Sequence, residues 1–260
     1  MNRSGRLLER INELLGKAET FCLVTVVRSD QPGAIARGNK AIVRSDGSIE
    51  AETAPFPVSV GLPELALKGL AEGKSRLATL AEGITVFLEV LAPEPWLVVC
   101  GAGHIAVPLA SFARQVGFRV TVLDDRPEFA HRARFPGCQV IAEDFPTALR
   151  ALSLGPATYI VVITRGHEHD RECLREVLGK QAAYVGLIGS RLRIGLVKEL
   201  LAREGIPTSL LEEVFTPIGL PIGAESPAEL ALCIAAELVC VRNLGAKQTR
   251  QHRSATGGAS

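Results

Sequence analysis

The segment Trp96-Leu97-Val98-Val99-Cys100-Gly101-Ala102-Gly103-His104-Ile105-Ala106 decides how the rest of the chain is interpreted. Its first five residues form a continuous apolar run, which is typical of a strand buried on both faces of a parallel sheet. The next six have the form GxGxxA, an accepted variant of the dinucleotide-binding fingerprint. We expect Gly101 to permit the turn, Gly103 to admit a pyrophosphate and Ala106 to let helix and strand pack closely. The phosphates would lie at the positive end of a helix over His104 to Gln115.

An acidic residue follows at the distance that this fingerprint requires. A second apolar strand, Arg119 to Leu123, leads into Asp124, about twenty residues on, where the ribose-binding acid is expected. Asp124 would accept hydrogen bonds from ribose hydroxyls, which favours NAD. Asp125 takes that role if the strand is one residue longer, and Arg126 would pair with the 2′-phosphate of NADP. The coenzyme is therefore NAD or NADP, and its expected contacts here are Gly101, Ala102, Gly103, His104, Ile105, Asp124, Asp125 and Arg126.

The fold class follows from the alternation of strands and helices around this segment. Further strands are expected at Thr158 to Ile163 and at Ala183 to Leu187, with stretches of helical period between them, which indicates a parallel sheet. The prolines of Ala92-Pro93-Glu94-Pro95 interrupt regular structure and indicate a domain boundary. We expect an α/β protein with a Rossmann-type C-terminal domain over 93–245 and a smaller N-terminal α/β domain over 1–92. Residues 246–260 are polar and end rich in glycine, so a disordered tail is expected.

The N-terminal domain shows a weaker pattern. Apolar residues at helical spacing from Leu7 to Leu15 predict a helix, and the β-branched run Phe21 to Val27 predicts a buried strand. A second helix is expected from Leu62 to Ala71, stopped by Gly73, and another strand from Ile84 to Leu91.

Polar residues follow the third predicted strand of the Rossmann domain. In open α/β sheets ligands bind beyond the carboxyl ends of strands, so Thr164, His167 and His169 are candidates to meet a ligand, as is Asp170. The alternative is a polar loop that caps the next helix. A metal site is not expected, because the two histidines lack a further ligand at diagnostic spacing.

Two more segments offer caps or ligand contacts. Gly189 and Ser190 follow the last predicted strand, where free amides would hold an anion, or where Ser190 caps the next helix. Ser226, with Pro227 and Glu229 behind it, forms the pattern of a capping box.

Composition limits the function classes. The chain has 260 residues and a formal net charge of +1, so it shows no electrostatic footprint for nucleic acid or a membrane surface. It has neither a signal-peptide core nor an apolar run of membrane-spanning length. Its six cysteines form no CxxC pair, which favours reduced thiols in the cytoplasm. We expect a cytoplasmic homodimer that binds something small or another protein.

Four blocks in this chain together resemble the xanthine dehydrogenase accessory factors, the XdhC/CoxI family. They are VCGAGHIAVPLASFARQVGFRVTVLDDRPEFA, ITRGHEHDRECL, YVGLIGSRLR and TPIGLPIGAESPAELALCIAAELV, and they span most of Trp96 to Arg242 in the family's order. The resemblance implies a protein that assists maturation of a molybdenum hydroxylase. It would bind the molybdenum cofactor and help its sulfuration and delivery, with the hydroxylase apoenzyme as partner.

The N-terminal domain departs from the family at one point. Family members usually carry Gly-Gly-Cys-x-Glu in a glycine-rich loop, and the best register places Val60-Gly61-Leu62-Pro63-Glu64 there. The cysteine is thus Leu62, which offers no thiolate for metal or sulfur chemistry. Binding of the molybdenum cofactor is therefore doubtful.

Three functions remain open at this point. The first is an XdhC-like accessory protein with a nucleotide site. The second is an NAD(P)-dependent oxidoreductase acting on a small substrate, although no Tyr-x-x-x-Lys pair is visible. The third is a nucleotide-sensing regulatory module. Whether the chain is an enzyme is left undecided.

Overall fold

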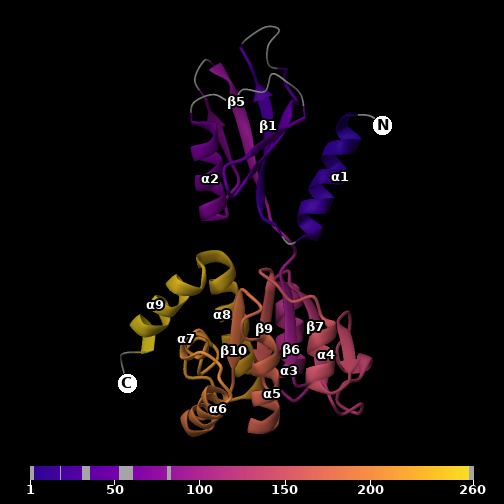
Figure 1. Cartoon of the computed structure of the whole chain (residues 1–260), viewed down its shortest axis with the longest axis vertical. Helices are drawn as coiled ribbons and strands as arrows, with labels where there is room; N and C mark the ends of the chain where they lie inside the picture. The colour runs from indigo at the N-terminus through magenta and orange to yellow at the C-terminus, as the bar shows by residue number, and fades with distance from the viewer. Residues whose placement is uncertain (1–2, 18, 31–35, 53–60, 81–82, 258–260) are drawn as a thin grey trace. The chain divides into compact units, whose positions relative to one another are not determined.

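The computed structural model describes residues 3–17, 19–30, 36–52, 61–80 and 83–257. The chain divides into two compact units, Met1–Pro93 and Glu94–Ser260, and each is described by itself (Figure 1). The division lies within the proline-containing segment 92–95.

The N-terminal unit is an antiparallel five-stranded sheet with a helix on each face. The strand order is β3-β2-β1-β5-β4. Alternate residues of β1 point to opposite faces: Cys22 and Val24 pack in one apolar cluster with α2, and Phe21 packs in another with Leu14 of α1. The elements are α1 (Arg3–Gly16), β1 (Phe21–Arg28), β2 (Lys40–Arg44), β3 (Ile49–Ala51), α2 (Leu62–Glu72), β4 (Arg76–Thr79) and β5 (Thr85–Leu91).

The C-terminal unit is a parallel five-stranded sheet in the order β10-β9-β6-β7-β8. From the central strand β6 the chain moves outward through β7 to β8, then crosses to β9 and β10 on the other side. This is the Rossmann order, with its topological switch point between β6 and β9. The strands are β6 (Trp96–Cys100), β7 (Arg119–Asp124), β8 (Gln139–Ala142), β9 (Thr158–Val162) and β10 (Tyr184–Leu187).

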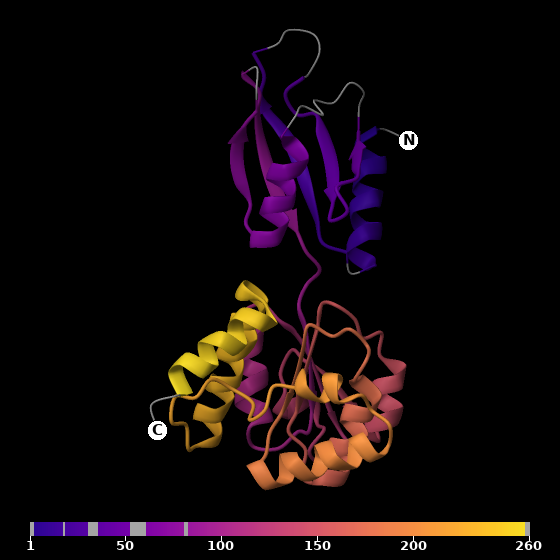
Figure 2. The same ribbon diagram turned by 60° about the vertical axis from the view of Figure 1, so that its left-hand side comes forward.

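Helices cover both faces of this sheet (Figure 2). Helices α3 and α8 pack in one apolar cluster with alternate strand residues such as Leu97 and Val99. Helices α4, α5 and α6 pack in the other, with Val98 and Cys100. The helices are α3 (Ala106–Gln115), the short η2 (Arg132–Arg134), α4 (Phe145–Ala151), α5 (His167–Val177), α6 (Arg191–Arg203), α7 (Thr208–Glu212), α8 (Pro227–Leu244) and α9 (Ala246–Gly257).

The predicted α/β class, with a Rossmann-type parallel sheet and a smaller α/β unit, is confirmed. The strand β2 and the short strands β3, β4 and β8 were not predicted from the sequence. The three short strands have three or four residues and a half-buried or alternating burial pattern, so none of them carries a continuous apolar run.

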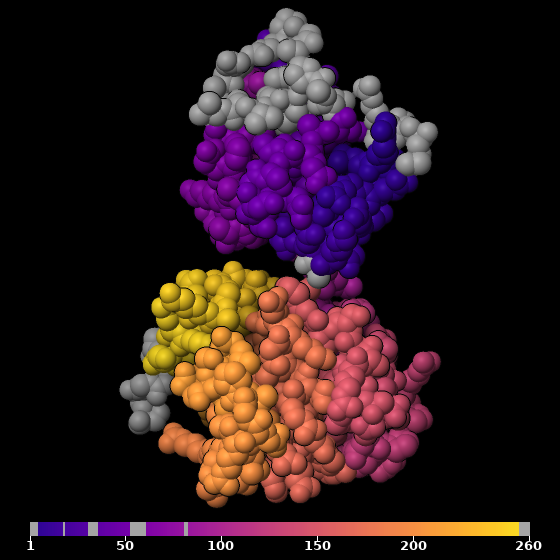
Figure 3. All heavy atoms as spheres, in the orientation of Figure 1, coloured from indigo at the N-terminus to yellow at the C-terminus, as the bar shows by residue number. Residues whose placement is uncertain are grey.

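The expectation of a disordered tail is wrong for most of its length. Residues Ala246–Gly257 form α9, which packs against α8, and Thr249 is fully buried. Arg253 pairs with the buried carboxylate of Glu237, and Arg250 stacks on the ring of Phe215. Figure 3 shows the yellow C-terminal segment against the orange part of the same unit. The polar composition of this segment suggested a solvated tail, but its cations Arg250 and Arg253 have partners in the core.

Candidate functional site

The glycine loop that follows β6 is shaped by a close approach of two strands. Gly101 has φ +112°, and a Cβ added there would lie 2.5 Å from the carbonyl oxygen of Ile163, just beyond the end of β9. The Gly101 amide donates to the carbonyl of Leu123 on β7 (2.8 Å). Only glycine fits a left-handed backbone in contact with another main chain. Gly101 therefore has the role that was predicted for the turn.

The next glycine is different, because nothing in the described part of the chain fills the space beside it. A Cβ on Gly103 would meet no atom within 4 Å, and its φ is not in the left-handed region. Its small size is therefore not needed for packing or for backbone conformation. An open approach to the backbone at this position is what a pyrophosphate needs. The residues present thus fit a dinucleotide.

Helix α3 begins at Ala106, two residues later than predicted, after a turn at His104 and Ile105. The side chain of His104 is exposed, as expected for a variable position of the fingerprint. Ala106 is buried in the cluster that joins α3 to the sheet, which matches its predicted packing role. Helix α3 therefore presents free amides and its positive end beside the glycine loop.

Asp124, the last residue of β7, is buried with 1% of its side chain exposed. Its Oδ2 accepts from the backbone N–H of Ala102 (2.8 Å) and from Nη2 of Arg126 (3.0 Å). Its Oδ1 accepts from Nε and the backbone N–H of Arg126 (2.8 and 3.1 Å). Burial alone would raise the pKa of Asp124, but these hydrogen bonds outweigh it and lower the pKa, so the carboxylate is ionised. Asp124 holds the glycine loop.

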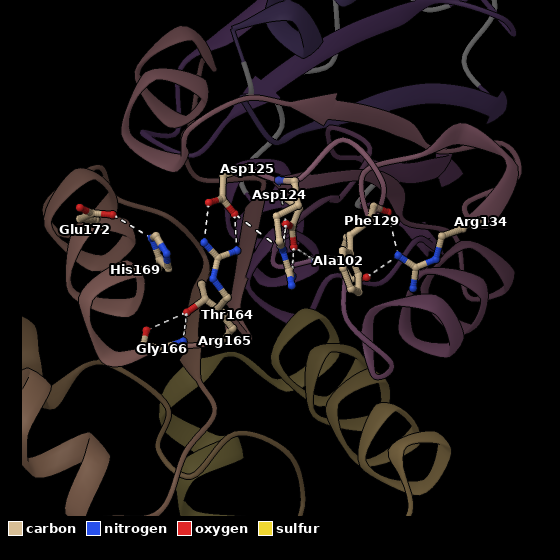
Figure 4. A network of polar contacts seen from close by, with 11 residues as sticks. Ala102, Asp124, Asp125, Phe129, Arg134, Thr164, Arg165, Gly166, His169 and Glu172 are labelled. Atoms are coloured by element: carbon tan, nitrogen blue, oxygen red, sulfur yellow. Dashed lines mark hydrogen bonds and ion pairs between the residues drawn. The ribbon is translucent and has the colours of Figure 1, made fainter.

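Two more arginines lie near the glycine loop. Arg165, which follows β9, makes two 2.8 Å hydrogen bonds to Asp125, which follows β7 (Figure 4). This ion pair joins the strands on either side of β6. Arg134 donates from Nη1 to the carbonyls of Ala102 and Phe129, both at 2.8 Å. Ala102 is thus held through its amide by Asp124 and through its carbonyl by Arg134.

A buried polar cluster joins the loop after β9 to helices α5 and α6. Asp170 is fully buried; it accepts from the hydroxyl of Thr164 (2.6 Å) and from Nε of Arg193 on α6 (2.7 Å). Burial raises the pKa of Asp170 above its usual value, although the bonds from Thr164 and Arg193 oppose this. The carboxylate of Asp170 faces inward and joins the end of β9 to α5 and α6, and its contact with a ligand stays a prediction.

The histidines of this block have different surroundings. His169 Nδ1 lies 3.1 Å from Glu172 Oε2 on its own helix, and its ring packs against Phe145. His167, the first residue of α5, is exposed. Among the described residues, no group of three or more His, Cys, Asp or Glu side chains could hold a metal ion.

The two predicted caps are present. Ser190 caps α6 by accepting from the N–H of Arg193 (3.3 Å), and Gly189 before it has φ +151°. Ser226 and Glu229 form the capping box of α8, with Pro227 in the first turn. Ser190 and Gly189 lie at the carboxyl end of β10, and the cap hydrogen bond is the contact that the structure shows for Ser190.

Sequence reasoning missed Arg134, Arg165 and Arg193 as neighbours of the site. They lie 32, 40 and 23 residues from Ala102, Asp125 and Asp170, the residues that they contact. The sequence held one signal for Arg165: it follows a predicted strand, and ligands of open α/β sheets bind at such positions.

A cavity of about 460 Å³ lies elsewhere, at the amino end of β10. Its lining includes Tyr184, Phe215 and the α9 residues Lys247 and Arg250. The glycine loop lies at the carboxyl ends of the strands, so this cavity is separate from the glycine loop. No helix in the described ranges has the length and apolar character needed to cross a membrane.

Leu62, at the position of the family's cysteine, is the first residue of α2 and is fully buried in the core of the N-terminal unit. Gly61 before it has φ +107°. The preceding residues of this segment, 53–60, lie outside the described part of the chain. A buried leucine does not fit a role in ligating a metal or carrying sulfur.

The strand order, the glycine loop at the switch point and the acid at the end of β7 define a protein with a Rossmann-type domain. A model of the XdhC Rossmann domain matches residues 97–238, more than half of the chain. The chain belongs to the XdhC family, which confirms the resemblance seen in the sequence.

Relatives agree with this assignment. The chain is 30% identical to the uncharacterised protein YqeB of Escherichia coli K12 over 240 residues, 86% of this chain and 44% of that protein. It is 34% identical over 158 residues to a Bacillus subtilis protein whose name describes it as a probable subunit of xanthine dehydrogenase, covering 60% of this chain and 46% of that protein. The chain thus spans less than half the length of these curated relatives.

A solved structure shows the same fold. A crystal structure described as a xanthine dehydrogenase from Bacillus halodurans superimposes with a TM-score of 0.66 and 24% identity, covering 96% of this chain and 68% of that one.

The contacts of Asp124 lead to a prediction about its role. In Asp124→Asn an amide –NH2 replaces one acceptor and faces donors of Arg126 in either orientation, and also the Ala102 N–H if it replaces Oδ2. We expect a loss of about 1.5–3 kcal/mol in the free energy of unfolding and weaker binding of NAD(H) and NADP(H) by similar factors. Urea unfolding and calorimetric titration measure the two effects. Asp144→Asn is the control, because asparagine also caps a helix. Selective loss of NAD(H) binding would instead show that Asp124 reads the ribose.

Proposed function

We propose that this chain is a dinucleotide-binding accessory protein that assists maturation of a molybdenum hydroxylase of the xanthine dehydrogenase type. The observation that carries the proposal is the intact glycine loop at the switch point of an XdhC Rossmann domain, with Gly103 open to a ligand. The hydroxylase apoenzyme as partner is supported by the family and by the name of the Bacillus subtilis relative.

The dinucleotide would lie across the carboxyl ends of β6 and β9. Its pyrophosphate would meet the backbone from Gly101 to Ile105 at the positive end of α3, and its adenosine ribose would lie near Asp124 and Asp125. When bound, a nicotinamide supplies hydride chemistry. The other half of the ligand would be bordered by Thr164 and His167, which follow β9, and by Gly189 and Ser190, which follow β10.

Leu62 offers no thiolate, so a pterin would depend on the Rossmann unit, near His167, His169 and Ser190. We expect little molybdenum cofactor to be retained in a pull-down, by the wild type or by Leu62→Cys. Strong retention by the wild type that is lost in Cys22→Ser would contradict this and would assign the role to another thiol.

The sharpest test of the dinucleotide site is Gly103→Val. Because a Cβ there meets no protein atom within 4 Å, the variant should fold with stability close to wild type. The added methyl groups would occupy the space through which the pyrophosphate approaches the backbone, so affinity should fall by about a hundredfold or more. Calorimetric titration with NADH and NADPH measures this.

Gly155→Val is the matched control. Gly155 is also a glycine outside regular structure with no atom within 4 Å of an added Cβ, but it precedes β9 at the amino end of the sheet. It should leave binding unchanged. Unchanged coenzyme affinity in a folded Gly103→Val protein would refute the site assignment, and failure of the wild type to bind either coenzyme would refute dinucleotide binding altogether.

A further inference from the structure

The acid expected to read a ribose has its carboxylate occupied in this structure. Asp124 receives four hydrogen bonds, one from Ala102 and three from Arg126, and almost none of its side chain is exposed. Recognition of NAD depends on a carboxylate that accepts from the hydroxyls of the adenosine ribose. The carboxylate of Asp124 instead binds the amide of Ala102 in the glycine loop and the side chain of Arg126.

Arg126 is held in a fixed position over this acid. Its guanidinium donates from Nε and Nη2 to Asp124 and lies 3.8 Å from the centre of the Phe129 ring. About a quarter of the side chain is exposed, 28%. The hydrogen bonds to Asp124 raise its pKa further, so it is a permanent cation at the ribose end of the site.

Asp125 lies between two guanidinium groups. Arg165 binds it through both carboxylate oxygens at 2.8 Å, and Nε of Arg126 is 4.0 Å away. This carboxylate is 24% exposed and the Arg165 side chain 43% exposed, so the pair is open to solvent and to a ligand. An exposed ion pair contributes little stability, so a competing anion can replace Asp125 at modest cost.

Two cations flank the exposed carboxylate at the end of β7. Arg165 binds Asp125 directly, and Arg126 lies 4.0 Å from it while binding Asp124. A phosphate in place of the Asp125 carboxylate would meet the fork of Arg165, which binds two oxygens at once, and the positive charge of Arg126, whose Nε and Nη2 stay on Asp124.

We propose that this site selects a dinucleotide with a 2′-phosphate on its adenosine ribose, NADP(H) rather than NAD(H). Arg165 binds the phosphate, which takes the position of the Asp125 carboxylate beside the positive charge of Arg126. The inference rests on the dinucleotide binding proposed above and adds the choice of coenzyme. It replaces the expectation that the acid after β7 favours NAD.

Calorimetric titration with NADPH, NADH and adenosine 2′,5′-bisphosphate, which carries the phosphate without nicotinamide, tests it. We expect the wild type to bind NADPH about tenfold or more tightly than NADH. Arg165→Gln should remove most of that difference by weakening NADPH and the bisphosphate alone, because Arg165 pairs with the part-exposed Asp125 and leaves the bonds of the buried Asp124 in place. Asp125→Asn should tighten NADPH several-fold relative to NADH, because it removes the competing carboxylate. Arg119→Gln, at the amino end of β7, is the control.

The outcomes separate this inference from the proposed function. Equal or tighter binding of NADH, or no tightening of NADPH relative to NADH in Asp125→Asn, would overturn the coenzyme choice while leaving dinucleotide binding in place. Absence of binding by both coenzymes would overturn both proposals.

Discussion

Gly101→Ala should destabilise the Rossmann unit by about 3–5 kcal/mol, because the substitution combines an unfavourable φ with a backbone clash. The added Cβ would lie 2.5 Å from the oxygen and 2.9 Å from the carbon of the Ile163 carbonyl. That main chain cannot move away easily, since the Ile163 amide donates to Cys100 (2.9 Å) and holds the two strands together. The same displacement would open the glycine loop, so coenzyme binding should be lost.

Urea unfolding followed by tryptophan fluorescence measures this effect in the Rossmann unit, which contains Gly101. The chain has one tryptophan, Trp96, which begins β6 and is 7% exposed. Gly103→Ala is the matched control two residues away, and should change stability by no more than about 1 kcal/mol. Equal destabilisation by the two substitutions would contradict the close approach of β6 and β9 as the reason for Gly101.

Arg253→Met should cost about 3–5 kcal/mol, because it leaves a buried carboxylate without its counter-charge. Glu237 is fully buried on α8, where Oε1 accepts from the hydroxyl of Tyr184 (2.5 Å) and the N–H of Gly219 (3.0 Å). Its Oε2 lies 2.9 Å from Nη1 of Arg253, an ion pair without the alignment of a hydrogen bond. Burial and the neighbouring carboxylate raise the pKa of Tyr184, so the hydroxyl stays protonated and donates.

A double-mutant comparison tests whether the unpaired charge of Glu237 causes the loss of stability. Glu237→Gln combined with Arg253→Met should be more stable than Arg253→Met alone, because the amide retains an acceptor for Tyr184 without a buried charge. Arg203→Met is the control: its pair with Glu199 is exposed and should contribute less than about 1 kcal/mol. If Arg253→Met had a similarly small effect, α9 would be only loosely attached to the core.

The sequence predicted the parts of the fold that depend on short-range pattern. The strands β6, β7, β9 and β10 were predicted to within about one residue at each end, because residues buried on both faces form continuous apolar runs. The capping box at Ser226 and the role of Gly101 were equally readable, since a cap or a turn involves neighbouring residues. The short edge strands β3, β4 and β8 were not predicted because their residues remain partly exposed, whereas the edge strand β10 is mostly buried.

The candidate site also has features that the sequence predicted and features that it did not. By itself the sequence determined that a glycine loop, a following helix and an acid at the end of the next strand lie together, because these features are local and Rossmann topology is restrictive. Only the tertiary structure decided which carboxylate is buried, since that depends on Arg126 folding back and on the amide of Ala102. It also brought Arg165 to Asp125 across β6 and Arg253 to Glu237. Such pairs form because a buried or half-buried charge requires a partner, and no sequence pattern specifies from how far along the chain that partner comes.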